Sequence, residues 1–385
     1  MQSVEFGIDV FLGKSVHVSR AARVAMVTND TARLASNSKL SSRVALQQAG
    51  FNLVRLFGPE HGISAAAADG AHVADGVDPL THVPVVSLYG SKVRPSAEEL
   101  RDIDLVLYDI PDVGARFYTY IWTLSHVLEA CAEAGKPLVV LDRPNPLGGD
   151  LRAAEGPMLD ESKFSTFVGR WNIPIRYSLT IGELATLWNI ERKIGADLRV
   201  VTCAGWTRDM QWPETKLSFV PTSPAIRDFE TALLYPGMCL VEGTNLSEGR
   251  GTEAPFRLIG APWIDGEQLA ARFDALALSG IAATPVEFTP SSRKHAGARC
   301  GGVRLDVTDA RALRPVAAGL HLIAAAIALD PGKFQWNAGH FDRLVGRGDV
   351  RQTLEMQAPG ASAQVVEWTE TGDWESRGKA HLLYA

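Results

Sequence analysis

The chain has 385 residues, of which 46% are hydrophobic and 21% charged, with 35 glycines and 21 prolines. This length and composition are typical of a globular protein with two packed units and exclude a disordered or fibrous chain. The net charge of −6, with both signs scattered along the sequence, provides no concentrated basic face, which excludes nucleic acid as an expected partner.

The cysteines and the apolar stretches limit the remaining classes. Cys131, Cys203, Cys239 and Cys300 are far apart without a zinc-binding spacing, so we expect buried thiols and neither a metal nor another cofactor. The apolar runs are shorter than the roughly 20 residues that span a bilayer, so no membrane partner is expected. The first residues lack a secretory signal, which predicts a cytoplasmic protein, or a periplasmic or secreted one if a leader was removed. Nothing indicates the oligomeric state.

Short β-branched runs alternate with helical stretches through the first 150 residues. This rhythm predicts parallel strands joined by crossover helices, and therefore an α/β fold with a doubly wound, mostly parallel sheet. The expected helices end at Gly50 and Gly135, because glycine commonly terminates a helix. Strands are expected at 23–27, 52–58, 83–90, 104–110 and 137–142, and helices at 41–50 and 120–135.

The pattern loosens after residue 150, so we place a first domain at 1–150 and a second, smaller one at 151–385. A helix is expected at 180–195, where Thr180 and Glu183 have the spacing of a capping box, which gives Glu183 a structural role. A strand at 302–309 and a buried helix at 313–330 predict a mixed α+β second domain.

Polar residues follow four of the predicted strands, and in open parallel sheets ligands bind beyond the carboxyl ends of the strands. We therefore expect these residues to form one rim. For some of them, helix capping and turn formation are an equally good explanation. The residues are Asn29 and Asp30; Glu60 and His61; Asp109, Asp112 and Arg116; and Asp142, Arg143 and Asn145.

Glu60 and His61 are poorly explained as turn residues, because neither is a favoured turn former. The Gly58-Pro59 lead and Gly62 fix the backbone while allowing a substrate to approach. A partly desolvated carboxyl group on such a loop can hold a raised pKa and donate a proton to a leaving oxygen. His61 would orient this carboxyl group or bind substrate, or else be a capping or exposed histidine.

Three further groups of residues are suited to binding. Arg116 can clamp a carboxylate, and Tyr118 and Tyr120 can stack on a sugar, although an internal ion pair with core tyrosines is an equal alternative. Glu155 is a further carboxylate after the predicted boundary. A glycine-rich polar segment at 241–256 indicates a binding loop rather than core, and its polar residues are Glu242, Thr244, Asn245, Glu248, Arg250 and Thr252.

The sequence lacks the usual motifs of several other enzyme classes. There is no G-x-G-x-x-G after the first strand, no G-x-S-x-G and no H-E-x-x-H, so dinucleotide-dependent enzymes, serine hydrolases of that type and zinc proteases are not indicated.

A series of longer motifs carries a family resemblance, from about residue 7 nearly to the C-terminus. They are GIDVFL, VTND, FGPEHGI, SLYG, DIPDVGARFYTYI, DRPNPLGG, EGTNLSEGRGT, GAPWID and KHAG. The chain resembles the exo-β-N-acetylmuramidases. The resemblance implies a Rossmann-like N-terminal domain, a smaller C-terminal domain and a cleft between them that removes terminal N-acetylmuramic acid from peptidoglycan fragments. It places the family's glutamate on Glu60, and its binding motifs on Arg116, Tyr118, Tyr120, Asn245, Glu248 and Arg250.

Together these observations predict glycoside hydrolysis with Glu60 as general acid. The second catalytic group is left open between Glu248, Glu155 and the substrate's own acetamido oxygen, with His61 assisting. Arg116 or Arg250 is expected to bind the lactyl carboxylate of muramic acid. The alternatives are a non-catalytic receptor for peptidoglycan fragments and a glycosidase with another amino-sugar substrate. The expected binding residues are Asn29, Asp109, Asp112, Arg116, Tyr118, Tyr120, Asp142, Arg143, Asn145, Thr244, Asn245 and Arg250.

Overall fold

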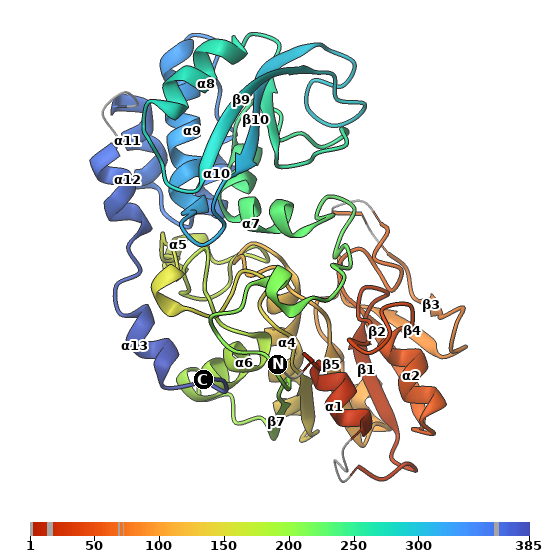
Figure 1. The fold of residues 1–385 in the computed structure, drawn as a ribbon. Coiled ribbons are helices and arrows are strands. Elements are labelled where there is room, and N and C mark those ends of the chain that lie inside the picture. Colours follow the sequence, from red (N-terminus) through yellow and green to blue (C-terminus); the bar gives the residue numbers. More distant parts are fainter. Residues whose placement is uncertain (1–2, 14–17, 68–69, 72, 358–361) are drawn as a thin grey trace.

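The computed structural model describes residues 3–13, 18–67, 70–71, 73–357 and 362–385. Figure 1 shows a larger unit built on a seven-stranded sheet, with a smaller unit above it. All neighbouring strands of the large sheet are parallel except β3, which is antiparallel to β4. In spatial order the strands are β3 (Gly76–Val77), β4 (Pro84–Ser87), β2 (Leu53–Gly58), β1 (Val24–Thr28), β5 (Leu105–Asp109), β6 (Leu138–Leu141) and β7 (Leu198–Val201).

The order of the six parallel strands is that of a Rossmann fold. If these strands are numbered along the chain, the sheet runs 3-2-1-4-5-6, and the direction of winding reverses between β1 and β5. The predicted α/β class and mostly parallel, doubly wound sheet are therefore confirmed.

Helices cover both faces of this sheet, because alternate strand residues point to opposite sides. In β1, Val24 and Met26 pack in one core cluster with residues of α1 and α2, whereas Ala25 and Val27 pack in another with residues of α4 and α6. Burial on both faces explains the nearly continuous apolar runs of the strands. The helices are α1 (Gly7–Gly13) and α2 (Ser42–Gln48) on one face, and α3 (Ala97–Arg101), α4 (Tyr120–Glu133) and α6 (Ile181–Glu191) on the other.

The predicted helix ends are confirmed. Gly50 and Gly135 follow α2 and α4 with φ values of 82° and 61°, the left-handed conformation that glycine adopts without strain. At the start of α6 the Thr180 hydroxyl accepts from the Glu183 amide at 3.2 Å, and the Glu183 carboxylate accepts from the Thr180 amide at 2.9 Å. Glu183 thus has the capping role expected of it.

Strand β7 lies beyond the predicted domain boundary near residue 150, yet it pairs with β6 in the large sheet. The sequence between β6 and β7 has lost the simple alternation because it includes several short segments around α6. We therefore propose that the two units divide between β7 and α7 (Phe229–Met238), later than the sequence pattern indicates.

The smaller unit has an antiparallel three-stranded sheet and helices, as expected of a mixed α+β domain. The predicted strand at 302–309 and helix at 313–330 correspond to β10 and α9. Its strands are β8 (Leu258–Ala261), β10 (Cys300–Val307) and β9 (Ile281–Phe288). Its helices are α8 (Gly266–Asp274), α9 (Pro315–Leu329), α10 (Ala338–Val345), α11 (Asp349–Gln357) and α12 (Ser362–Thr369), together with α7.

The C-terminal segment returns to the larger unit along one side of the molecule (Figure 1). The indole N–H of Trp374 donates to the Tyr177 carbonyl at 2.9 Å, and the Tyr384 hydroxyl donates to the Asp142 carboxylate at 2.6 Å. The last helix is α13 (Trp374–Lys379), and the remaining short elements are α5 (Glu161–Phe164), η1 (Leu151–Ala153), η2 (Trp212–Thr215) and η3 (Cys239–Gly243).

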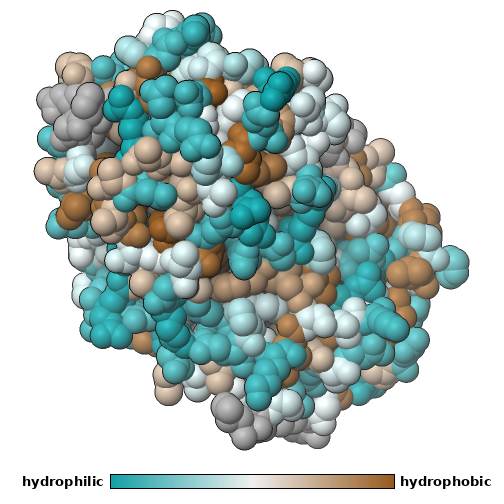
Figure 2. Space-filling view, turned by 45° about the horizontal axis from the view of Figure 1, so that its top comes forward, coloured by the Kyte–Doolittle hydropathy of each residue, from teal (hydrophilic) through white to brown (hydrophobic). Residues whose placement is uncertain are grey.

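All four cysteines are buried free thiols, as predicted. Within the described ranges, none of the helices has both the length and the apolar character needed to traverse a lipid bilayer. On the face shown in Figure 2, hydrophobic side chains are scattered among hydrophilic ones.

Candidate active site

Glu60 and His61 lie in a tight turn directly after β2. The Gly62 amide donates to the Pro59 carbonyl at 2.9 Å, and His61 itself has φ 66°, a left-handed conformation that costs energy for a residue with a side chain. Gly62 also has positive φ, and a Cβ atom there would lie 2.8 Å from the Val73 side chain. The glycine therefore permits a close approach that fixes this turn.

The Glu60 carboxyl group is held by two donors, one on each oxygen. The Gly70 amide donates to Oε1 at 3.0 Å and the Thr119 hydroxyl to Oε2 at 2.7 Å. The His61 Nδ1 atom lies 2.7 Å from the Ala67 carbonyl, so His61 fixes the following loop. Glu60 is 8% exposed and thus largely removed from water, while its position is fixed from both sides.

Glu60 opens into a cavity of about 280 Å³ between the two units, here called the interdomain cavity. The larger unit supplies the 60–61 turn and the 117–119 segment, and the smaller unit supplies α7, η3, the 250–256 segment and α10. The titratable side chains around it are Glu60, His61, Tyr118, Tyr235, Cys239, Glu242, Arg250 and His340.

A second carboxylate, Glu242, lines the interdomain cavity from the smaller unit. It accepts a hydrogen bond from Arg250 Nη2 at 2.8 Å and lies 3.5 Å from His340 Nε2. The neighbouring Gly243 makes this grouping possible, because a Cβ atom there would lie 2.4 Å from Phe341 Cβ. The close packing of η3 on α10 thus brings Glu242 and His340 together.

The protonation state of Glu242 follows from these contacts. Burial favours the neutral acid and would raise the pKa, but the hydrogen bond with His340 and the Arg250 charge outweigh it and lower the pKa of Glu242 to about 2. At neutral pH the cavity wall therefore contains an ionised carboxylate in addition to Glu60.

Of the two predicted tyrosines, only Tyr118 reaches the interdomain cavity. Its ring packs edge-on against Tyr120 and Tyr235, with centroids 4.8 and 6.0 Å apart, and burial raises its pKa. Tyr120 is 1% exposed, and its hydroxyl donates to the Thr222 carbonyl and accepts from the Asn29 amide at 3.1 Å. These bonds tie Tyr120, at the start of α4, to Asn29 after β1 and to the 212–222 segment.

The two other predicted catalytic carboxylates lie outside the lining of the interdomain cavity. Glu155 is fully buried at the start of α9, where it accepts from the Val316 and Ala317 amides at 3.4 and 3.1 Å, beside the Arg314 guanidinium at 3.7 Å. This geometry is that of a helix cap. Glu248 lies behind Arg250, 3.6 Å from its Nε and 3.1 Å from Lys294 Nζ.

Arg116 does not face the interdomain cavity either. Its side chain is fully buried and donates to four backbone carbonyls, of Pro157 and Ile173 in one unit and of Leu344 and Val345 in the other. These contacts make Arg116 a bridge between the units. Arg250 is the predicted carboxylate-binding arginine that lines the cavity.

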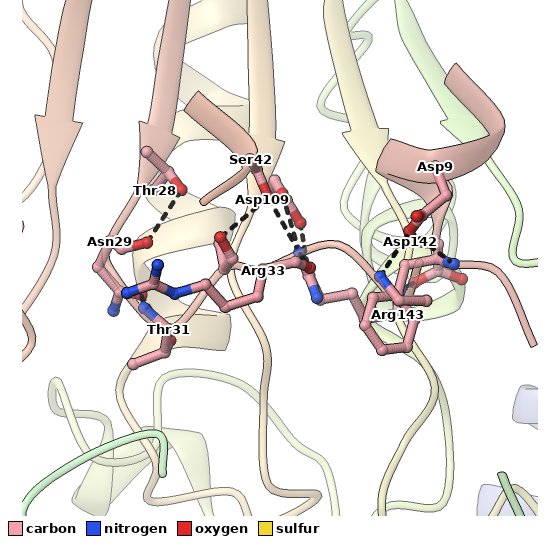
Figure 3. A network of polar contacts seen from close by, with 12 residues as sticks. Asp9, Thr28, Asn29, Thr31, Arg33, Ser42, Asp109, Asp142 and Arg143 are labelled. Carbon is pink, nitrogen blue, oxygen red and sulfur yellow. Dashed lines mark hydrogen bonds and ion pairs between the residues drawn. The ribbon is translucent and has the colours of Figure 1, made fainter. Parts of the chain in front are cut away.

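Most of the other predicted residues at the strand ends are engaged with each other or with the backbone (Figure 3). Arg143 pairs with Asp109, with Nη2 to Oδ2 at 3.0 Å. Asp142 accepts from Thr180 at 2.7 Å, and burial raises its pKa to about 6. Asn145 donates to the Leu179 carbonyl at 2.9 Å. These contacts hold the turns after β5 and β6, which is the alternative explanation that the sequence allowed.

The predicted binding loop also divides into structural and cavity-facing residues. The Thr244 hydroxyl donates to the Val241 carbonyl at 2.9 Å, and the side-chain amide of Asn245 donates to the Lys333 carbonyl at 2.8 Å, so both residues hold the loop in place.

Asp112 and Arg143 line a different cavity, at the ends of β5 and β6. The expected single rim is therefore two separate surfaces.

Sequence reasoning missed Thr119, Tyr235 and His340, and it named Glu242 only as part of a polar loop. Thr119 adjoins the predicted tyrosines, so its position was indicated without its role. Tyr235 and His340 lie in helices without an unusual local pattern, so no sequence signal marked them.

Comparison with known proteins defines the family. The profile of the exo-β-N-acetylmuramidase NamZ N-terminal domain matches residues 24–230, and that of the NamZ C-terminal domain matches residues 233–384. The chain belongs to the NamZ family. The two NamZ profiles meet between residues 230 and 233, in the first turns of α7, close to where we propose that the units divide.

Individual relatives agree with this assignment. The peptidoglycan β-N-acetylmuramidase NamZ of Bacillus subtilis (strain 168) is 42% identical over 353 residues, which cover 91% of this chain and 84% of the relative. A crystal structure of a DUF1343 family protein from Bacteroides fragilis NCTC 9343 has a TM-score of 0.90 at 30% identity, covering 100% of this chain and 99% of that one. A second DUF1343 protein from the same organism has a TM-score of 0.79 at 29% identity over the same shares.

Proposed function

We propose that this chain is an exo-acting glycoside hydrolase that releases terminal N-acetylmuramic acid from peptidoglycan fragments, with Glu60 as the general acid. Membership of the NamZ family supports the activity. The observation that carries the assignment of Glu60 is its presentation on a strained turn into the interdomain cavity, opposite the ionised Glu242.

The hydrogen bonds of Glu60 suit a positioned acid. The Thr119 hydroxyl and the Gly70 amide fix the orientation of the carboxyl group, so that its proton can be directed at the glycosidic oxygen. When the bond breaks, the proton passes to the leaving sugar, and the resulting carboxylate can then accept a proton from water.

Glu242 is the strongest candidate among the carboxylates for the second role. It is ionised, as a nucleophile or a base must be, and it lines the interdomain cavity, unlike Glu155 and Glu248. A nucleophile lies about 5 Å from the acid, whereas an inverting base lies roughly 6.5–9.5 Å away. The substrate's acetamido oxygen is the alternative to a protein nucleophile.

Recognition of muramic acid requires a cation for its lactyl carboxylate. Arg250 supplies a planar guanidinium in the interdomain cavity, next to the ring of Phe256. Tyr118 and Tyr235 supply aromatic surface on which the apolar face of a sugar can pack. Arg250 also pairs with Glu242, so we propose that the lactyl carboxylate shares this guanidinium with Glu242.

The test is release of a chromophore from an aryl N-acetyl-β-muramide. Glu60→Gln should lower kcat by about 10²-fold or more while binding of N-acetylmuramic acid is retained. Glu155→Gln is the matched control, because this buried glutamate caps α9, and it should retain wild-type turnover. Undiminished turnover in Glu60→Gln would remove the acid role.

The same assay separates the other functions. Binding of muramic acid without any release by the wild type would identify a receptor, and faster release from an aryl N-acetylglucosaminide would identify a different amino-sugar substrate. The cytoplasmic location and the lack of nucleic-acid and membrane partners stay predictions from the sequence.

A further inference from the structure

The larger unit contains a second cavity of about 490 Å³, here called the strand-end cavity. Its walls come from the segments that follow β1, β5 and β6, together with the 212–222 segment. It therefore lies beside the point between β1 and β5 where the strand order reverses, the position at which open α/β sheets bind ligands. The proposed hydrolysis uses none of its residues.

The strand-end cavity is separate from the interdomain cavity. Thr222 lines the former and the adjacent Ser223 lines the latter, so the chain at these two residues forms the partition. A hydrogen bond from the Tyr120 hydroxyl to the Thr222 carbonyl holds this partition in place. The two cavities are thus neighbours that have no lining residue in common.

The outer wall of the strand-end cavity is held in place before any ligand arrives. The Asp9 carboxylate accepts from the Ala35 and Ser36 amides at 2.9 and 3.0 Å, and Arg143 donates to the Arg33 carbonyl at 2.9 Å (Figure 3). These bonds fix the 31–39 segment that follows β1. A preformed wall lowers the entropic cost of binding.

Positive charge predominates around the strand-end cavity. Arg33, Lys39, Arg143 and Lys216 line it against a single acid, Asp112. Arg143 already pairs with Asp109, but Lys39 and Lys216 form no ion pair with any residue in the described part of the chain. Their charges are therefore available to an anionic ligand.

The remaining wall provides apolar faces and a buried acceptor. Phe6, Trp212 and Phe219 line the cavity. The ring centroids of Phe6 and Trp212 are 6.1 Å apart, and those of Trp212 and Phe219 are 5.6 Å apart. Asp112 is 8% exposed, and while its Oδ2 accepts from the Gly114 amide at 2.7 Å, its Oδ1 has no hydrogen-bond partner among the described residues. This oxygen is closed to solvent, so Asp112 adds a buried acid to the wall and not an open acceptor.

A nucleotide fits this wall poorly. The segment from Asn29 to Ser41 contains no glycine to form a phosphate cradle, and the Ser42 amide at the start of α2 already donates to the Ala32 carbonyl at 2.9 Å. Aromatic faces and unpaired lysines together suit a sugar ring that bears a carboxylate.

We propose that the strand-end cavity is a second binding site for a carboxylate-bearing sugar of the muramic acid type, held by Lys39 and Lys216 and by the aromatic wall of Phe6, Trp212 and Phe219. The choice of sugar rests on the proposed function. Two sources share this chemistry, namely free N-acetylmuramic acid and a second muramic acid residue of the same glycan chain.

The test is calorimetric titration of N-acetylmuramic acid into Glu60→Gln, with N-acetylglucosamine as the neutral control. Two equivalents of the acid should bind, and Lys39→Gln combined with Lys216→Gln should remove one of them or weaken it about tenfold. Lys163→Gln is the matched control, because this exposed lysine lies on α5 away from both cavities. One equivalent that survives the lysine changes, or two unaffected by them, would overturn the proposal.

Kinetics with wild-type Glu60 distinguish the sources. For a tetrasaccharide with two muramic acid residues, a KM raised about tenfold by the double lysine change, with an unaltered disaccharide KM, indicates the same glycan chain. If the double lysine change leaves the KM of both substrates unaltered but removes the second equivalent in the titration, the ligand is the free sugar. Turnover of the aryl muramide does not depend on this site. A wild-type protein that does not turn over the aryl muramide would refute the proposed function, whereas the second site is judged by the titration alone.

Discussion

Arg116 offers the sharpest test of the difference between a binding residue and a structural one. Its guanidinium donates to the carbonyls of Pro157, Ile173, Leu344 and Val345 at 2.6, 2.8, 2.9 and 2.7 Å. We expect Arg116→Met to destabilise the fold while leaving the affinity for N-acetylmuramic acid unchanged, because the side chain is 0% exposed and faces no cavity.

The magnitude follows from two opposing contributions. Hydrogen bonds from a charged donor are worth about 2 kcal/mol each, so the four together contribute about 8 kcal/mol. Burial lowers the pKa of Arg116 from 12.5 to about 9, which corresponds to a desolvation cost of about 5 kcal/mol. The difference predicts a loss of about 3 kcal/mol in the free energy of unfolding for Arg116→Met.

The assay is equilibrium unfolding in urea, with the muramic acid affinity measured on the folded variant. Arg250→Gln is the matched comparison, because this arginine lines the interdomain cavity, and it should lose affinity for the acid sugar with a smaller change in stability. An Arg116→Met protein of wild-type stability that no longer binds muramic acid would refute this reasoning and restore Arg116 as a binding residue.

Three other predictions concern carboxyl groups. Burial raises the pKa of Asp112 from 3.8 to about 7, so the contribution of this carboxyl group to stability is complete below pH 4 and is lost as pH rises towards 7. The unfolding free energy of the wild type should therefore fall relative to that of Asp112→Asn by about 4 kcal/mol across this range. Parallel pH profiles of the two proteins would contradict this. Glu155→Gln should lower the unfolding free energy by about 1 kcal/mol through the weakened α9 cap, and a large loss of kcat in a stable variant would show a catalytic role instead. Glu242→Gln should lower kcat by about 10²-fold or more, whereas an unchanged kcat would favour the acetamido oxygen as the second group.

Local patterns were sufficient for most of the first 150 residues. The strand at β1 and the helix at α4 were evident because their apolar periodicity and terminal glycines act within a few residues. Strand β7 was missed because short irregular segments surround α6, and only pairing with β6 makes it part of the sheet.

Some features of the candidate site likewise follow from local sequence, and others depend on tertiary contacts. The sequence by itself determined the parallel sheet, the turn that presents Glu60 and the polar character of the 241–256 segment, because each depends on neighbouring residues and on glycine and proline geometry. Only the tertiary structure decided that Glu242 and His340 line the same cavity as Glu60, that Arg116 bridges two units and that the strand ends contribute to two cavities. Those facts depend on contacts between residues far apart in the chain, such as the packing of Gly243 on Phe341, which no local pattern encodes.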